Sequence, residues 1–109
     1  MKHRLRKKKR VGEFKELGFE VRTDLRPGLA REDFDRFLAR WIDAVEARHL
    51  AFGGGGGGSD GKFEGFVARM GRGSATEEDR WALAAFLAGE ATVVHHEVLE
   101  LRDAWYGWD

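Results

Sequence analysis

Six consecutive glycines, at positions 53–58 near the middle of the chain, limit what this chain can fold into more than any other feature. Glycine has no side chain to bury, and it readily adopts the positive φ angles that tight turns need. Two short apolar stretches, residues 50–52 and 63–70, flank the run. The pattern predicts a β-hairpin in which the glycines, followed by Ser59, Asp60 and Gly61, join two strands.

The same glycines also suggest a nucleotide site, because residues 56–62 have the G-x-x-x-x-G-K spacing of a phosphate-binding loop. Phe63, however, stands where that motif needs a Ser or Thr hydroxyl for magnesium. The residues after Phe63 have the pattern of a strand, whereas phosphate binding needs the N-terminus of a helix. A linker therefore explains the glycines better than a nucleotide site does.

Length and composition bound the class of protein. The 109 residues suit one domain with a core of its own, and the absence of cysteine excludes disulfides, thiolate metal sites and thiol catalysis. No apolar run approaches the ~20 residues that span a bilayer, and the basic N-terminus has no apolar segment behind it. We therefore expect a cytoplasmic protein with no membrane partner.

The formal net charge of zero hides a strong separation of charge. Seven Lys and Arg residues and no acid lie in residues 1–10: Lys2, Arg4, Arg6, Lys7, Lys8, Lys9 and Arg10. Subtracting these 7 from 19 basic residues leaves 12 against 19 acidic ones, so residues 11–109 carry a charge of −7. The pattern predicts a disordered basic arm, residues 1–10, that binds RNA phosphates, followed by a single acidic domain, residues 11–109. The alternative is a tail that only solvates the chain.

Hydrophobic periodicity predicts the order of elements. Residues 17–25 alternate between apolar and polar side chains, which predicts a half-buried strand. Residues 31–48 carry apolar side chains at helical spacing, which predicts a helix. Glu32 and Asp33 at its start, and Arg48 and His49 at its end, have the charges that the helix dipole favours. A second helix is expected over residues 77–88, capped by Thr76 with Asp79, and a last strand over residues 92–101.

This order predicts an α+β fold of the ferredoxin-like, split β-α-β-β-α-β type. We expect a four-stranded antiparallel sheet with two helices on one face and an open second face. Helix 77–88 is apolar on most of its sides, which indicates that it packs on the sheet and also against the first helix or a partner.

No catalytic or metal site emerges from the sequence. His95 and His96 are adjacent, so on a strand they point to opposite faces and cannot readily bind one metal ion. Glu77, Glu78 and Asp79 suit a helix start better than an acid/base pair. We therefore expect no enzyme activity, no cofactor and no small-molecule substrate.

Residues 62–69, KFEGFVAR, resemble part of the motif that RNA-recognition sheets carry on a central strand. The Lys, Gly65, Phe66 and Val67 match that motif. Glu64 and Arg69 replace two of its aromatic positions, so base stacking of that type loses two of three platforms.

Three aromatic side chains, Trp105, Tyr106 and Trp108, crowd the C-terminus. They either fold back over the open sheet face, or present an anchor to a partner, since Trp and Tyr dominate binding energies at interfaces. A competing hypothesis follows from the first option: a ferredoxin-like ligand-binding or enzyme domain with a pocket between the sheet and this tail.

Taken together, the basic arm leading into VGEFKELGFEV, the central LAFGGGG with EGFV and GRGSATEE, and the closing LRDAWYGW resemble the YggL family. The resemblance covers nearly the whole chain. It departs from the family pattern in the length of the glycine run and at Phe63, where the resemblance leads us to expect Trp. The resemblance implies a bacterial cytoplasmic protein that associates with the 50S ribosomal subunit, through rRNA and ribosomal proteins, without catalytic activity.

Overall fold

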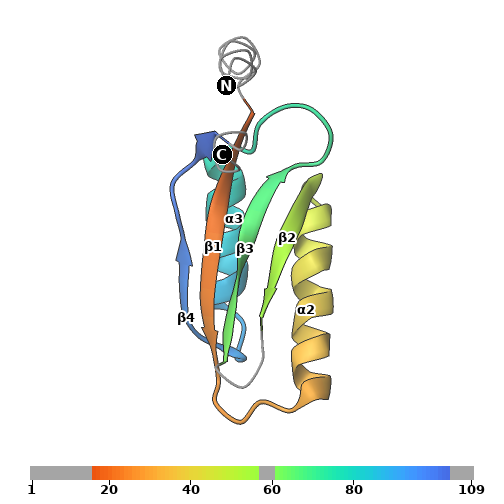
Figure 1. Cartoon of the computed structure of the whole chain (residues 1–109), viewed down its shortest axis with the longest axis vertical. Helices are drawn as coiled ribbons and strands as arrows, with labels where there is room; N and C mark the ends of the chain where they lie inside the picture. Colours follow the sequence, from red (N-terminus) through yellow and green to blue (C-terminus); the bar gives the residue numbers. More distant parts are fainter. Residues whose placement is uncertain (1–15, 57–60, 104–109) are drawn as a thin grey trace, which may run out of the picture.

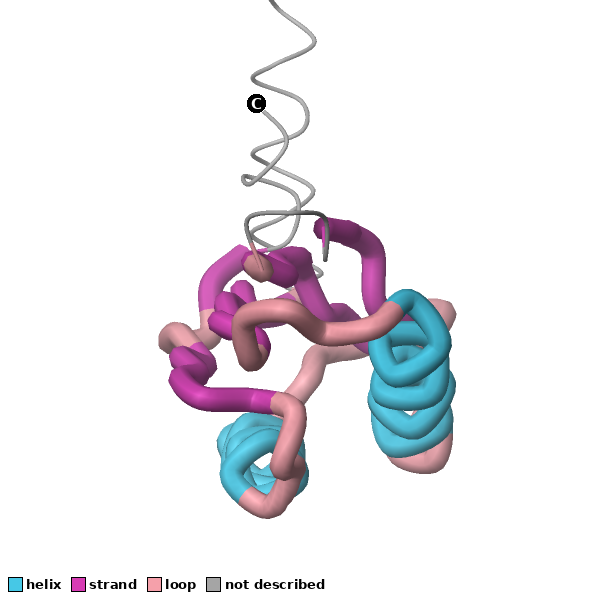
Figure 2. Tube along the Cα trace, turned by 90° about the horizontal axis from the view of Figure 1, so that it is seen from below, coloured by secondary structure: helices cyan, strands magenta, loops and turns pink. Residues whose placement is uncertain are grey.

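The computed structural model describes residues 16–56 and 61–103. In chain order the elements are β1 (Leu17–Leu25), α2 (Arg31–Glu46), β2 (Leu50–Gly56), β3 (Lys62–Arg69), α3 (Glu77–Ala88), β4 (Val93–Val98) and β5 (Arg102–Asp103). The strands form one antiparallel sheet of order β2-β3-β1-β4, and β5 pairs with the start of β1. Both helices lie on the same side of the sheet (Figures 1 and 2). The α+β class is confirmed, and the order of elements and strands is consistent with the expected split arrangement.

Strand β1 lies in the middle of the sheet and is built as its alternating sequence predicts. Phe19, Val21 and Leu25 are buried on the face covered by the helices, whereas Arg22 is exposed on the other face. Thr23 is also buried, and its hydroxyl donates a hydrogen bond of 2.9 Å to the carbonyl of Phe63 on β3. The buried hydroxyl therefore keeps a partner, which removes the cost of burying it.

Strand β2 corrects the prediction that all six glycines only link strands. β2 continues through Gly56, and Gly53, Gly54, Gly55 and Gly56 pair in register with Phe66, Gly65, Glu64 and Phe63 of β3. A β ladder bonds backbone to backbone, so glycines can extend it without side chains once a partner strand lies beside them. The predicted hairpin is confirmed, with a shorter connection than expected.

Phe63 is the centre of the core. Its ring lies 5.2 Å from that of Phe52 on β2, 5.6 Å from Phe37 and 6.5 Å from Trp41 on α2, measured between ring centroids. Trp41 in turn lies 6.0 Å from Phe86 on α3, so one group of aromatic rings joins both helices to the hairpin. Phe63 is only 1% exposed, so the position where the resemblance led us to expect Trp is a core position.

Helix α3 begins with the predicted cap, whereas α2 ends earlier than predicted. Thr76 and Asp79 form a reciprocal capping box, in which the Asp79 N–H donates to the Thr76 hydroxyl at 3.1 Å and the Thr76 N–H donates to the Asp79 carboxylate at 2.9 Å. Helix α2 ends at Glu46, so the prediction that Arg48 and His49 stabilise its last turn is wrong. The chain turns at His49 (φ 61°), and Arg48 instead reaches α3, where its Nε lies 2.8 Å from Asp79 Oδ1.

The last predicted strand, residues 92–101, is divided in two. Leu25 pairs with Val93 but Asp24 with His95, so Val94 is an extra residue in the strand and is 61% exposed. A second shift separates β4 from β5: Val21 pairs with Val98, and Gly18, three residues earlier, pairs with Arg102, four residues later. Such bulges place an additional residue in one strand and change the face of the residues that follow.

Gly54 gives a test of the β2 pairing. A Cβ at Gly54 would lie 2.3 Å from the Glu64 carbonyl oxygen, whereas a Cβ at Gly53 or Gly55 would meet no atom within 4 Å. We expect Gly54→Ala to lower the free energy of unfolding by about 2 kcal/mol, since backbone has to move. The controls Gly53→Ala and Gly55→Ala should be neutral or stabilising by up to about 1 kcal/mol. Urea denaturation measures all three, and equal values would contradict the pairing.

Asp79 gives a pH-dependent test. Burial alone would raise its pKa, but the hydrogen bonds from Arg48 and Thr76 outweigh burial, so the pKa of Asp79 is lowered in the folded protein. A lowered pKa adds stability above the unfolded value of about 3.9, and this stability is lost as the pH falls through the lower folded value.

At neutral pH we therefore expect Asp79→Asn to lower the free energy of unfolding by about 2 kcal/mol, because the charged hydrogen bond to Arg48 is lost. The gap between this variant and the wild type should close as the pH falls below about 4. Asp43→Asn, at an exposed position of α2, is the control and should show no such gap. Chemical denaturation over a pH series measures the difference, and a gap that stays constant to low pH would refute the role of the carboxylate.

Candidate functional site

One end of the sheet gathers the segments that the sequence marked as functional. Leu17 pairs with Asp103, and it bonds to the loop before α3 through Ser74 Oγ at 2.8 Å and the Ala75 N–H at 2.9 Å. Arg69 ends β3 beside Leu17, since Gly18 pairs with Ala68. We call this end, formed by Leu17, Arg69, Ala75 and Asp103, the arm end, because residues 1–16 precede Leu17 in the chain. The opposite end, formed by Leu25, Arg26 and Val93, is the far end (Figure 1).

The predicted site residues themselves lie outside the described residues. These are the basic residues of the arm and the aromatic residues of the C-terminus: Lys2, Arg4, Arg6, Lys7, Lys8, Lys9, Arg10, Trp105, Tyr106 and Trp108. What the described residues fix is where both segments join the fold. Because Leu17 and Asp103 are paired neighbours, the arm and the aromatic tail are attached at the same end of the sheet.

Most basic side chains of residues 16–56 and 61–103 are paired with acids, as Arg22 is with Glu20 at 3.1 Å and Arg40 with Glu90 at 2.7 Å. These pairs favour the charged guanidinium, so the hydrogen bonds from Arg22 and Arg40 raise the pKa of each. The exceptions among the described residues, with no carboxylate within 4.0 Å, are Arg26, Arg69 and Arg102.

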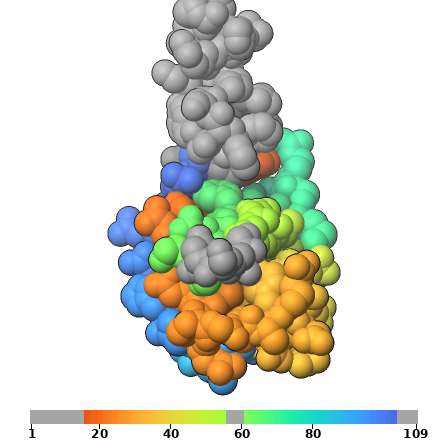
Figure 3. Space-filling view, turned by 60° about the horizontal axis from the view of Figure 1, so that its bottom comes forward, coloured from red at the N-terminus to blue at the C-terminus, as the bar shows by residue number. Residues whose placement is uncertain are grey.

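These three arginines lie at opposite ends of the sheet. Arg69 and Arg102 are exposed at the arm end, on strands that pair with β2 and β1 there. Arg26 follows β1 at the far end. Figure 3 shows this end turned toward the viewer, with the segment that follows β1 in orange. Two cations without a carboxylate partner therefore lie at the end of the sheet where the basic arm is attached.

The open face of the sheet carries paired charges. Lys62 Nζ lies 3.0 Å from Asp24 Oδ1, and Arg22, bonded to Glu20, stands opposite both Glu64 and Glu97 in the strand register. The aromatic position that Glu64 replaces is therefore part of a charged cluster. Phe66, an aromatic residue that the partial RNA-recognition motif retains, lies on this face of the described sheet, because it pairs with Glu20.

Phe66 is held between strands at the arm end of the open face. Its ring covers Gly18 of β1, where a Cβ would lie 2.5 Å from Phe66 Cε2, so this position requires glycine. The Arg102 guanidinium carbon lies 5.2 Å from the centroid of the Phe66 ring. A cation at this distance from a ring is attracted to its π face. The contact holds Arg102 in place while leaving its charge exposed.

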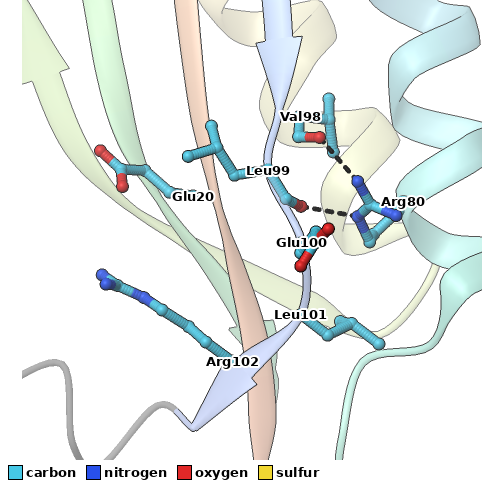
Figure 4. Close-up of a pocket in the computed structure, with 7 residues that line it drawn as sticks. All are labelled: Glu20, Arg80, Val98, Leu99, Glu100, Leu101 and Arg102. Atoms are coloured by element: carbon cyan, nitrogen blue, oxygen red, sulfur yellow. Dashed lines mark hydrogen bonds between the residues drawn. The ribbon is translucent and has the colours of Figure 1, made fainter.

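A shallow hollow of about 450 Å³ lies where β4 passes into β5 (Figure 4). Arg80 of α3 reaches this segment and donates to the carbonyls of Leu99 at 2.6 Å and Val98 at 2.7 Å, and to Glu77 at 2.6 Å. All of its donor groups are thus directed at the protein, and Arg80 fastens β4 to α3. The hollow is lined by the apolar residues Val98, Leu99 and Leu101 and by Glu20, Glu100 and Arg102, with Arg80 already engaged.

The described residues hold neither a cluster of metal-binding side chains nor a helix that could span a membrane. The register puts His95 opposite Asp24 and His96 opposite Thr23, so the two histidines face opposite sides of the sheet, as predicted. No group of three or more His, Asp or Glu side chains able to hold a metal ion occurs within residues 16–56 and 61–103. None of the helices described here is long and apolar enough to cross a membrane.

Sequence reasoning missed two features of this end of the molecule. It gave no role to Arg69 and Arg102, because their lack of an acidic partner depends on strand pairing. It also gave no role to Arg80, whose acceptors are backbone carbonyls 18 and 19 residues away. Neither feature has a local signature in the sequence.

The fold and this end define a small α+β protein with one face of its sheet covered by two helices and the other exposed and charged. A family model described as YggL 50S ribosome-binding protein matches residues 3–106. The chain therefore belongs to the YggL family, as the resemblance indicated.

Proposed function

We propose that this protein is a non-enzymatic, cytoplasmic factor that binds the 50S ribosomal subunit. The observation that carries the proposal is the match to the YggL 50S ribosome-binding family over nearly the whole chain. Lys2, Arg4, Arg6, Lys7, Lys8, Lys9 and Arg10 contact rRNA phosphates, while the domain of residues 11–109 supplies the remaining contacts.

The separation of charge supports this assignment of roles. The arm has seven basic residues, and the remainder carries −7 (12 basic less 19 acidic residues). Phosphate attracts the first and repels the second, so the arm supplies the favourable electrostatic energy with RNA. Arg69 and Arg102 extend the same charge onto the folded domain, because they lack carboxylate partners among the described residues and lie at the arm end.

The length of residues 11–16 is consistent with the arm and the folded domain contacting the same region of rRNA. Residues 11–16, which join the arm to Leu17, span at most ~20 Å when fully extended. Basic residues of the arm can therefore lie on phosphates close to Arg69 and Arg102. The whole arm end then faces the rRNA.

Deletion of residues 1–10 tests the arm. We expect the chain starting at Val11 to bind 50S subunits more weakly than the full chain, with a smaller dependence on salt. About six to ten phosphate contacts lose ~10³-fold or more in affinity between 50 and 200 mM salt, and the arm's basic residues fall near the lower end. Sucrose-gradient sedimentation with purified subunits at several salt concentrations measures this. Equal co-migration of both chains at every salt concentration would remove the arm from the proposal.

The unpaired arginines give a test with a matched control. We expect Arg69→Glu with Arg102→Glu to weaken 50S binding by roughly tenfold and to lower the salt slope by about one per lost phosphate contact. Arg26→Glu makes the same substitution at one arginine of the far end, with half the charge change of the double variant, and should leave binding near the wild-type value. If Arg26→Glu weakens binding per charge as much as the double variant does, net charge rather than the arm end accounts for affinity.

A further inference from the structure

The outward side of helix α3 is apolar and uncovered. Trp81, Ala85 and Ala88 lie on it at helical spacing, and all three are exposed, with Trp81 66% exposed. We call these three residues, with Glu78 of the first turn, the α3 patch. An exposed side chain as large as this indole, followed by small side chains over the next two turns, leaves an exposed apolar surface.

The other sides of α3 account for the burial that the sequence predicted. Leu83 and Leu87 are buried in the core, and Phe86 meets Trp41 of α2. Arg48, two residues after the end of α2, bonds to Asp79, so this segment also lies on the inward side of α3. A helix that is apolar on nearly all sides is normally covered on them. The outward side of α3 is the one that the described fold leaves uncovered.

The charge of the patch selects the kind of partner. Glu77 and Glu78 stand in the first turn of α3, and Glu78 has no ion pair among the described residues. Arg80 is the basic residue of α3, and it is turned to Val98, Leu99 and Glu77. The patch therefore presents an aromatic ring and a free carboxylate with no exposed cation on the helix, which repels phosphate and attracts a cationic partner.

The patch lies next to the arm end. Ala75 is bonded to Leu17, and α3 begins two residues later at Glu77, so Glu78 and Trp81 lie in the turns of the helix nearest the attachment of the arm. A partner bound to this patch would therefore lie close to the rRNA phosphates that the arm contacts. A subunit made of RNA and basic protein segments offers both chemistries at short distance.

We propose that the α3 patch binds a lysine- or arginine-rich protein segment of the 50S subunit, a proposal that rests on the proposed function. A lysine or arginine of that segment packs its aliphatic stem on Trp81, places its cation against the ring, and pairs with Glu78. Ala85 and Ala88 allow the backbone of the segment to approach. The domain of a second copy is a poorer occupant, because residues 11–109 of each copy carry −7 (12 basic less 19 acidic residues).

Photo-crosslinking identifies the occupant directly. We expect Trp81→p-benzoylphenylalanine in the full chain, irradiated with purified 50S subunits, to crosslink to a basic segment of a ribosomal protein. The control is Val94→p-benzoylphenylalanine, at a position 61% exposed at the far end, which should give no such product. Crosslinks to rRNA alone, or to a second copy alone, would overturn the proposal, as would the absence of any product while the chain still sediments with 50S.

Two substitutions test the energetics. We expect Trp81→Ala and Glu78→Lys each to weaken 50S binding by about tenfold, the loss typical of a contact that matters at an interface. Val94→Ala is the control for loss of an exposed apolar side chain. Glu32→Lys is the control for charge, because Glu32 holds the same place in the first turn of α2 as Glu78 does in α3. Both controls should bind as the wild type does.

The outcomes separate this proposal from the one on which it rests. If the wild-type chain does not sediment with 50S at low salt, the proposed function fails. If the wild type and the arm variants behave as expected but Trp81→Ala and Glu78→Lys bind as tightly as their controls, only the α3 proposal fails. Thermal unfolding of each variant accompanies the binding data. Since Trp81 is mostly exposed, its replacement should leave the midpoint within a few degrees, and Glu78→Lys tests the patch without altering the ring.

Discussion

The packing of Phe63 against four aromatic rings is the constraint on which the structure depends. Rings from α2 and β2 meet on its side chain, and the Phe52 ring occupies room that only glycine leaves. The Phe52 ring lies over Gly65, where a Cβ would stand 2.5 Å from Phe52 Cζ, and Gly54 lets the β2 backbone approach β3. The glycines and the aromatic side chains of the hairpin are therefore one packing arrangement.

The central position of β1 organises the remainder. Because β1 pairs with β3, β4 and β5, its first residues meet the last described strand, and its last residues meet the start of β4. The result is a molecule with two distinct ends. The arm end joins the attachment points of the basic arm and the aromatic tail to Arg69, Arg102 and the start of α3. The far end carries, at or near it, residues of comparable chemistry that are distant from the attachment points of the arm and the tail: Arg26, Glu32 and Val94.

Our two proposals divide binding between charges of opposite sign. A basic arm acts on phosphate, and an acidic helix face with one exposed tryptophan acts on a cationic protein segment. Each surface repels the partner of the other, since like charges disfavour contact. A chain with a formal net charge of zero can in this way select a surface made of both RNA and basic protein, and the orientation of the domain on that surface follows from the distance between the two contacts.

The sequence alone determined the class of fold, most element boundaries, the capping of α3 and the family, because hydrophobic period, cap residues and motifs are local properties. It also showed that α3 is apolar on most sides. Only the tertiary structure decided how far the glycines extend β2, where the bulges fall in the last strand, which arginines lack a carboxylate and which side of α3 stays uncovered. Each of these depends on a partner distant in the chain: a ladder on β3, a register with β1, or the placement of α2. Whether a side chain is paired or buried depends on residues that are distant in the sequence. Local sequence patterns do not reveal these contacts, because strand pairing and helix packing create them.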